Sequence, residues 1–250
     1  MKALKTVDKS KPILNDLPNS EFKDLFHSLG KGNVCDTESK GHSAPQNRSP
    51  LEIVLDASEG FIPLWGKNST LKWRFQKRSF ARFRNGAALK KAIKTIFGKS
   101  LIAWGNAAPV KFTENNDIWD FEIIMVSQNN CSGGCVLASA FFPDPGRNEI
   151  RIYPKFFDQT EKEQIETMIH ELGHVFGLRH FFAKISETAW PSEIFGVHNK
   201  FSIMNYGNLS ALTADDKNDM ARLYQSAWAG GINNINGTPI KFIKPYTSLI

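Results

Sequence analysis

The sequence contains no apolar run near the roughly 18 residues that a membrane-spanning helix requires, so no membrane span is expected. Residues 1–22 carry a lysine near the start but no apolar stretch behind it, and they do not resemble a secretory signal peptide. Three explanations stay open: a signal peptide was already removed, the chain leaves its cell by another route, or it stays inside the cell.

Cysteine is scarce, and its count of three is odd, which argues against a fold held by a full disulfide framework. Cys131 and Cys135 lie in NNCSGGC, where two glycines give the backbone enough freedom to close a small ring. We expect a disulfide there if the protein meets an oxidising compartment. Free thiols are the alternative. The two cysteines could also form half of a metal site, but the sequence contains no second Cys/His cluster to complete it.

Acidic residues are outnumbered, and the formal net charge is +6. Part of this excess lies in residues 71–84, which contain Lys72, Arg74, Lys77, Arg78, Arg82 and Arg84. One interpretation is a patch for anionic partners or an acidic substrate. The plainer one, which we prefer, is a solvated edge strand and loop. No nucleic-acid-binding motif accompanies the stretch, so a nucleic-acid partner is not expected.

The 250 residues suit one domain with an extension. Residues 1–50 are polar, and 40–50 have the Ser, Pro, Gly, Asn and Gln content of a linker. Apolar residues become dense from Leu51, so the folded domain is placed at 51–250. We see no internal repeat.

Apolar spacing predicts the main elements of this domain. Alternating apolar residues or short apolar runs predict strands at 71–75, 110–114, 121–126, 135–142 and 149–153, with a turn at 143–146. Steps of three and four predict a helix at 85–104. Two further helices open with capping signals at Thr160 and Thr213, and Gly177 is suited to end the first. This order predicts an α+β fold with a mixed sheet backed by two helices.

Histidine is also scarce, yet three of the six histidines fall within residues 170–180. His170 and His174 are one helical turn apart, about 5.4 Å along the axis, so both imidazoles can reach one ion. After the turn at Gly177, His180 can return as a third ligand. Glu171 is offset by one residue from His170, so its side chain does not point along the line of the two histidines. It can reach a water molecule on the metal without binding the metal itself. The pattern predicts a metal site with one open position.

Three neutral imidazoles and an open position are typical of catalytic rather than structural zinc. Zinc lowers the pKa of water to about 7 and polarises a carbonyl group. Glu171 would then act as the general base and later protonate the leaving amine. The ligand set favours zinc over copper or nickel, although another divalent ion stays open. The expected reaction is hydrolysis of a peptide bond.

The pattern HExxHxxGxxH, followed by SIMNY at 202–206, resembles the zinc motif and Met-turn of the metzincin peptidases. Within that clan the chain is most similar to the matrixins, the matrix-metalloproteinase family, over about residues 60–226. The segments that resemble matrixin elements are LKWRF (71–75), AIKTIFGKSLIAWGNAAPVKFTE (92–114), GGCVLASAFFPDPG (133–146) and LTADDKNDMARLYQ (212–225).

This resemblance implies a twisted mixed sheet with an active-site helix and a backing helix in residues 51–177. Residues 178–250 would form a small subdomain with the Met-turn and a C-terminal helix. Met204 would form a hydrophobic floor beneath the metal. Leu137 and Ala138 would lie on the edge strand that pairs with an extended substrate. A secreted, monomeric metalloendopeptidase acting on proteins or peptides is implied.

Several features depart from the matrixin pattern. Ser139 occupies the place of a histidine that helps bind a second, structural zinc, so one catalytic zinc is expected and no structural one. Calcium binding stays open. Tyr206, two residues after Met204, is similar to a tyrosine of astacins and serralysins, which makes it a candidate oxyanion donor or else a packed side chain.

The thiol-switch motif of matrixin pro-segments is missing. Cys35 or Asp36 could still cap the metal, but a leader or remnant is the preferred interpretation of residues 1–50. Two alternatives to an endopeptidase also stay open: an inert zinc- and peptide-binding pseudoprotease, and a zinc amidohydrolase of narrow specificity. The presence of Glu171 argues against the first, because a binding module does not need that carboxylate.

Overall fold

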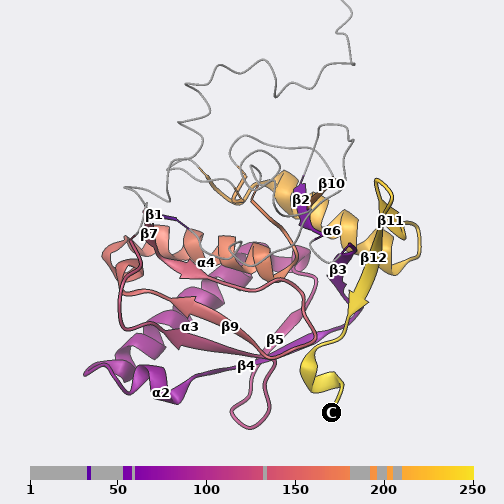
Figure 1. The fold of residues 1–250 in the computed structure, drawn as a ribbon. Coiled ribbons are helices and arrows are strands. Elements are labelled where there is room, and N and C mark those ends of the chain that lie inside the picture. The colour runs from indigo at the N-terminus through magenta and orange to yellow at the C-terminus, as the bar shows by residue number, and fades with distance from the viewer. Residues whose placement is uncertain are drawn as a thin grey trace, which may run out of the picture.

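The computed structural model describes residues 33–34, 53–57, 60–131, 134–180, 192–195, 202–204 and 210–250. Its centre is a twisted five-stranded sheet with the order β5-β4-β6-β9-β8 (Figure 1). The strands are β4 (Thr70–Phe75), β5 (Lys111–Glu114), β6 (Phe121–Met125), β8 (Ala138–Ser139) and β9 (Asn148–Ile152). All neighbours are parallel except β8, which pairs antiparallel with β9 at one edge. The predicted α+β fold with a mixed sheet is confirmed.

Two long helices pack beside each other, as predicted (Figure 1). Helix α3 (Gly86–Trp104) lies against the sheet through Phe97, whose ring centroid is 5.2 Å from that of Trp73 and 6.5 Å from that of Phe121. Helix α4 (Glu161–Val175) contacts α3 through Trp104, whose indole N–H donates to the Ile169 carbonyl at 3.1 Å. The aromatic core therefore fixes α4 relative to the sheet.

Helix α4 begins at the predicted capping box. The Thr160 hydroxyl accepts from the Glu163 N–H, and the Glu163 carboxylate accepts from the Thr160 N–H at 2.8 Å. Its other end is also satisfied, because the Trp65 indole N–H donates to the Val175 carbonyl at 2.7 Å. The Tyr224 hydroxyl donates to the Phe176 carbonyl at 2.9 Å. Burial raises the pKa of Tyr224, which keeps this donor protonated.

Helix α6 (Ala214–Trp228) begins at the second predicted cap, where Thr213 and Asp216 form a capping box. It supplies Tyr224 and also Trp228, whose indole N–H donates to the Trp65 carbonyl at 2.9 Å. The smaller helices are α2 (Lys77–Phe80) and the 3-10 turns η3 (Gly105–Ala107), η4 (Pro154–Asp158) and η5 (Tyr246–Ser248).

Three small sheets were not predicted. They contain β1 (Asn33–Val34) with β7 (Cys135–Val136), β2 (Ile53–Asp56) with β10 (Ser192–Phe195), and β11 (Asn234–Ile235) with β12 (Thr238–Ile243) and β3 (Ile62–Trp65). Strand β12 runs parallel to β3, so the residues after Gly231 return to the start of the domain (Figure 1). The chain after α6 is thus an integral part of the fold.

Two predictions are corrected. Residues 135–142 are not one strand, because β7 pairs with β1 and β8 pairs with β9, and Leu137 separates them. The stretch at 71–84 does not begin with an edge strand, because β4 lies between β5 and β6. Its Arg74 pairs with Glu122 at 2.8 Å and stacks on the Trp119 ring. Among the described residues, no helix is long and apolar enough to span a membrane.

Candidate metal centre

Three histidine side chains converge, as the spacing predicted. The ligand atoms of His170, His174 and His180 all lie within 4.8 Å of one another, and the Nε2 atoms of His170 and His180 are 3.0 Å apart. Three nitrogens on one tetrahedral zinc ion lie roughly 3.4 Å apart, for bonds of about 2.1 Å. All three side chains are buried, with at most 1% exposed. This group could hold a metal ion.

Main-chain carbonyls set the orientation of two of these rings. His170 Nδ1 lies 2.8 Å from the Ile203 carbonyl oxygen, and His174 Nδ1 lies 2.8 Å from that of Leu178. A carbonyl oxygen only accepts, so each Nδ1 carries the proton and donates. The Nε2 atom of each neutral ring then keeps its lone pair for a metal. Such outer partners fix the tautomer of metal-binding histidines.

The third histidine is placed by the turn that ends α4. Gly177 has φ +95°, a left-handed conformation that favours glycine, and its N–H donates to the His174 carbonyl at 2.8 Å. A Cβ at Gly177 would lie 3.3 Å from the Pro63 carbonyl oxygen, so the turn also packs against β3. Leu178 then forms an isolated antiparallel bridge with Leu55 of β2, two residues before His180. The chain is therefore held on both sides of the turn.

Met204 packs against α4 between the two helical histidines. A Cβ on Gly173 would overlap the Met204 sulfur and lie 3.3 Å from its methyl carbon. Met204 is 3% exposed. The glycine in HELGH therefore leaves the space that this methionine fills.

The turn that contains Met204 is tied to α6 by the buried carboxylate of Asp216. Its Oδ1 accepts from the Ser202 hydroxyl at 2.7 Å, and its Oδ2 accepts from the Ile203 N–H at 3.4 Å. The Ser202 hydroxyl oxygen accepts in turn from the Met204 N–H at 3.2 Å. Because the Ile203 carbonyl orients His170, Asp216 acts on the histidine site through the main chain.

The chain that follows the edge strand β8 lies close to the histidine site. Among the described strands, β8 is terminal in its sheet, and the chain after it brings the Phe142 ring to 5.5 Å from that of His174. The Leu137 and Ala138 side chains are buried, with 0% and 1% exposed. These values cover the whole residues, so their main chains are buried as well. Glu171 is also fully buried, in α4 beside His170.

The remaining predicted residues are placed as follows. Cys131 forms a disulfide with Cys135, the first residue of β7. Ser139 lies in β8 and is buried. Tyr206, Cys35 and Asp36 lie outside the described residues, so their roles stay predictions. Asn33–Val34, just before Cys35, pair with β7 and so lie beside the strand that precedes the sheet edge.

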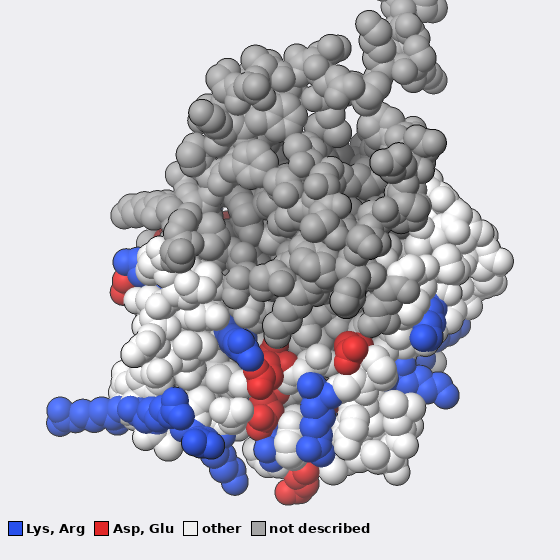
Figure 2. All heavy atoms as spheres, viewed as in Figure 1, with Lys and Arg blue, Asp and Glu red and all other residues white. Residues whose placement is uncertain are grey.

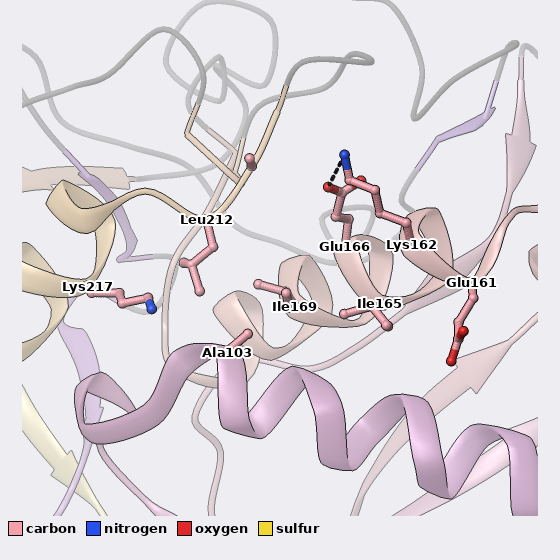
Figure 3. Close-up of a pocket in the computed structure, with 9 residues that line it drawn as sticks. Ala103, Glu161, Lys162, Ile165, Glu166, Ile169, Leu212 and Lys217 are labelled. Carbon is pink, nitrogen blue, oxygen red and sulfur yellow. Dashed lines mark ion pairs between the residues drawn. The ribbon is translucent and has the colours of Figure 1, made fainter.

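A separate hollow of about 460 Å³ lies between α3, α4 and the segment that enters α6 (Figure 3). Ala103, Ile165, Ile169 and Leu212 form its apolar lining, and Lys162 and Glu166 stand at its margin. Burial raises the pKa of Glu166. The Lys162 ammonium, 3.8 Å away, partly offsets this rise, and the nearby Glu163 carboxylate adds to it. None of the described site residues lines this hollow.

Sequence reasoning missed several contributors to the site. Gly173 carries a signal, because glycine inside a helix is costly and suggests close packing. Asp216 was recognised only as part of a helix cap. The carbonyls of Ile203 and Leu178 have no signal in the sequence, because every residue has a carbonyl group.

No protein-family model matches the sequence, and no curated protein matches it. Among solved structures, the chain is similar to two structures of myroilysin, each at 14% identity. One has a TM-score of 0.46 and covers 68% of this chain and 98% of that chain. The other has a TM-score of 0.44 and covers 81% and 95%. The interpretation of the site therefore rests on the geometry of its own residues.

Proposed function

We propose that this protein is a zinc-dependent endopeptidase of the metzincin type, closest to the matrixins. One observation carries the proposal: three buried histidines converge through ring nitrogens, and carbonyls hold two of the rings in the metal-binding tautomer. Glu171 follows His170 directly in the same helix. This donor set fits one zinc ion with an open position.

The residues divide the chemistry among them. When bound, a zinc ion supplies Lewis acidity, which polarises a carbonyl group and lowers the pKa of water. The Glu171 carboxylate accepts the proton of the attacking water and then delivers it to the leaving amine nitrogen. The burial of Glu171 restricts competing water. Met204 and Gly173 hold the floor of the site in place.

Substrate binding is proposed along β8. An extended peptide is proposed to pair with the edge of the sheet at β8 through main-chain hydrogen bonds at Ala138 and at Leu137, just before the strand, while side-chain pockets select the sequence. Both residues are buried in the structure and would have to become exposed for this pairing. The run from β8 to Phe142, beside His174, leads a peptide aligned on that edge toward the histidines. Hydrolysis of extended protein segments follows from this arrangement.

Two further roles belong to the proposal. The Tyr206 hydroxyl donates a hydrogen bond to the oxyanion in the transition state, as its position two residues after Met204 suggests. The protein acts outside the cytosol, a location that suits the Cys131–Cys135 disulfide. It acts as a monomer.

Cleavage of a peptide library tests the function. We expect the zinc-loaded chain to cut many extended peptides, a chelator to abolish cleavage, and added zinc to restore it. A chain that binds zinc but cuts no peptide would instead be a pseudoprotease. Cleavage confined to a single peptide would identify a narrow amidohydrolase. Either result would reject the proposal of a general endopeptidase.

A further inference from the structure

The positive charge of the chain is concentrated in one segment. Residues 60–113 contain twelve lysines and arginines and no aspartate or glutamate, although the net charge of the whole chain is only +6. The rest of the chain is therefore net acidic. This segment comprises β3, β4, α2 and α3, and none of the three metal-binding histidines belongs to it.

Nine of these twelve residues fall into two groups, and Lys67, Lys72 and Lys111 belong to neither. Arg74, Lys94 and Lys99 are used internally, in ion pairs with Glu122, Glu114 and Glu161. The second group, here called the basic corner, lies on α2, on the link from α2 to α3 and on the first turns of α3. It consists of Lys77, Arg78, Arg82, Arg84, Lys90 and Lys91.

The basic corner is exposed to solvent, and its charges are not balanced by ion pairs within the described residues. All of its side chains are exposed except Lys90, which is half-buried with its ammonium 5.3 Å from the Phe80 ring centroid. Within the described part of the chain, none of its members forms an ion pair. Figure 2 shows lysine and arginine side chains gathered at the lower left, where Figure 1 places α2.

The backbone beneath the basic corner is held in place. A Cβ on Gly86 would overlap the Phe80 carbonyl oxygen, so α2 and the start of α3 are in close contact. The Ser79 hydroxyl oxygen accepts from the Met125 N–H of β6 at 3.2 Å, and the Phe80 ring lies 5.1 Å from that of Phe75. The charges are thus presented by a fixed scaffold, which lowers the entropic cost of binding a partner.

We propose that the basic corner binds a linear acidic polysaccharide that carries sulfate or carboxylate groups. Three of its six members are arginines, whose planar guanidinium groups form bidentate hydrogen bonds with such anions. A chain of repeated anionic groups can engage several of these side chains at once. Binding would hold the enzyme on an anionic matrix while the histidine site stays free.

The observations favour this partner over a membrane or a nucleic acid. Membrane-surface helices combine basic residues with exposed apolar ones, but the exposed large apolar residues of the described chain (Ile102, Ile118, Phe242, Leu249 and Ile250) all lie outside the basic corner. Binding of single-stranded nucleic acid relies on exposed aromatic rings, whereas Phe80 is buried and Phe83, between Arg82 and Arg84, is half-buried and packs against the core. The proposed action outside the cytosol, on which this step rests, also favours a polysaccharide.

Retention on heparin, a sulfated polysaccharide, tests the proposal. The corner variant replaces Lys77, Arg78, Arg82, Arg84 and Lys91 by glutamine. A matched control replaces the exposed lysines Lys67, Lys111, Lys162, Lys241 and Lys244 by glutamine, which removes the same charge elsewhere. Both are used as zinc-loaded full chains, with folding checked by circular dichroism and zinc content. Measurement of peptide cleavage separates this test from that of the proposed function.

We expect wild type to elute from heparin at higher salt than from a sulfopropyl resin. The corner variant should bind heparin roughly tenfold or more weakly, while the control variant stays close to wild type. Peptide cleavage should be unchanged in both. Equal weakening in the two variants would show that only net charge matters and would overturn the proposal. Preferential binding of a DNA duplex or of phosphatidylserine vesicles by wild type would overturn it as well.

Discussion

The sulfur of Met204 lies against Gly173, in the space that any larger residue at this fourth position of HELGH would need. This contact joins the helix that carries His170 and His174 to the turn that orients His170. The Ile203 carbonyl, one residue before Met204, accepts from that histidine. The close approach at Gly173 therefore sets the distance between the helix and the turn.

Replacement of Gly173 by alanine should displace Met204. Because the new methyl group overlaps the sulfur, we expect a loss of about 1–3 kcal/mol in the free energy of unfolding. Zinc affinity should fall about tenfold or more as the turn moves. Chemical denaturation and competition with a zinc chelator measure the two effects.

Gly98 provides the matched control, because it lies inside α3 with no atom within 4 Å of a Cβ. Gly98→Ala should stabilise the protein by roughly 0.5–1 kcal/mol. The losses caused by Gly173→Ala and Met204→Ala should be less than additive in the double variant, since it has no overlap. A Gly173→Ala variant as stable as wild type would refute the packing account.

Asp216→Asn should weaken metal binding although Asp216 is not a proposed ligand. The change disturbs its hydrogen bonds with Ser202, Ile203 and Thr213, so we expect about 1–3 kcal/mol less stability. Zinc affinity should fall by about 10- to 100-fold, the range for partners that orient ligands. Asp215→Asn, one residue earlier and exposed, should cost less than about 1 kcal/mol. Equal effects of the two variants would assign Asp216 to helix capping alone.

Glu166→Gln should change how stability depends on pH. Burial raises the pKa of Glu166 in the folded state, so the folded protein binds this proton up to a higher pH than the unfolded chain does. The free energy of unfolding therefore falls as pH rises from the ordinary glutamate pKa through the raised one. Glutamine does not titrate, so the variant should gain stability relative to wild type as pH rises above about 4.

Glu161→Gln is the control, because Glu161 is exposed and pairs with Lys99. Its variant should lose a few tenths of a kcal/mol relative to wild type, the usual scale for an exposed ion pair. Melting temperatures between about pH 4 and 8 measure both differences. A flat difference for Glu166→Gln would contradict the assigned burial of its carboxyl group.

Tyr206→Phe should lower kcat by about 10- to 1000-fold with little change in zinc content, on the scale of losing one oxyanion donor. The matched control is Tyr246→Phe in η5, where the ring rather than the hydroxyl contacts Arg147. That variant should keep the wild-type rate. An unchanged rate in Tyr206→Phe would assign the hydroxyl to packing.

Local signals predicted the parts of the fold that depend on neighbouring residues. The capping box at Thr160 and the turn at Gly177 were readable because each acts over a few positions. The spacing of His170 and His174 was readable for the same reason. Strand β12 was missed because its partner β3 lies far away in the sequence, and no local pattern encodes such a pairing.

The candidate site, like the fold, was predictable only where it depends on local sequence. The residue types and spacing of the three histidines predicted their convergence. The roles of Asp216 and of the Ile203 carbonyl depend on how α6 meets the turn at 202–204, which only the three-dimensional arrangement shows. The expectation of an edge strand over 71–75 failed because β4 is covered on both sides, by β5 and β6.

Peptide cleavage by Glu171→Gln, measured beside its zinc content, tests the central claim most directly. Glutamine keeps the shape of the buried side chain but cannot accept the proton of water. The account predicts one zinc per chain, as in wild type, and a loss of about 100-fold or more in kcat. Wild-type cleavage by the zinc-loaded variant would contradict the account.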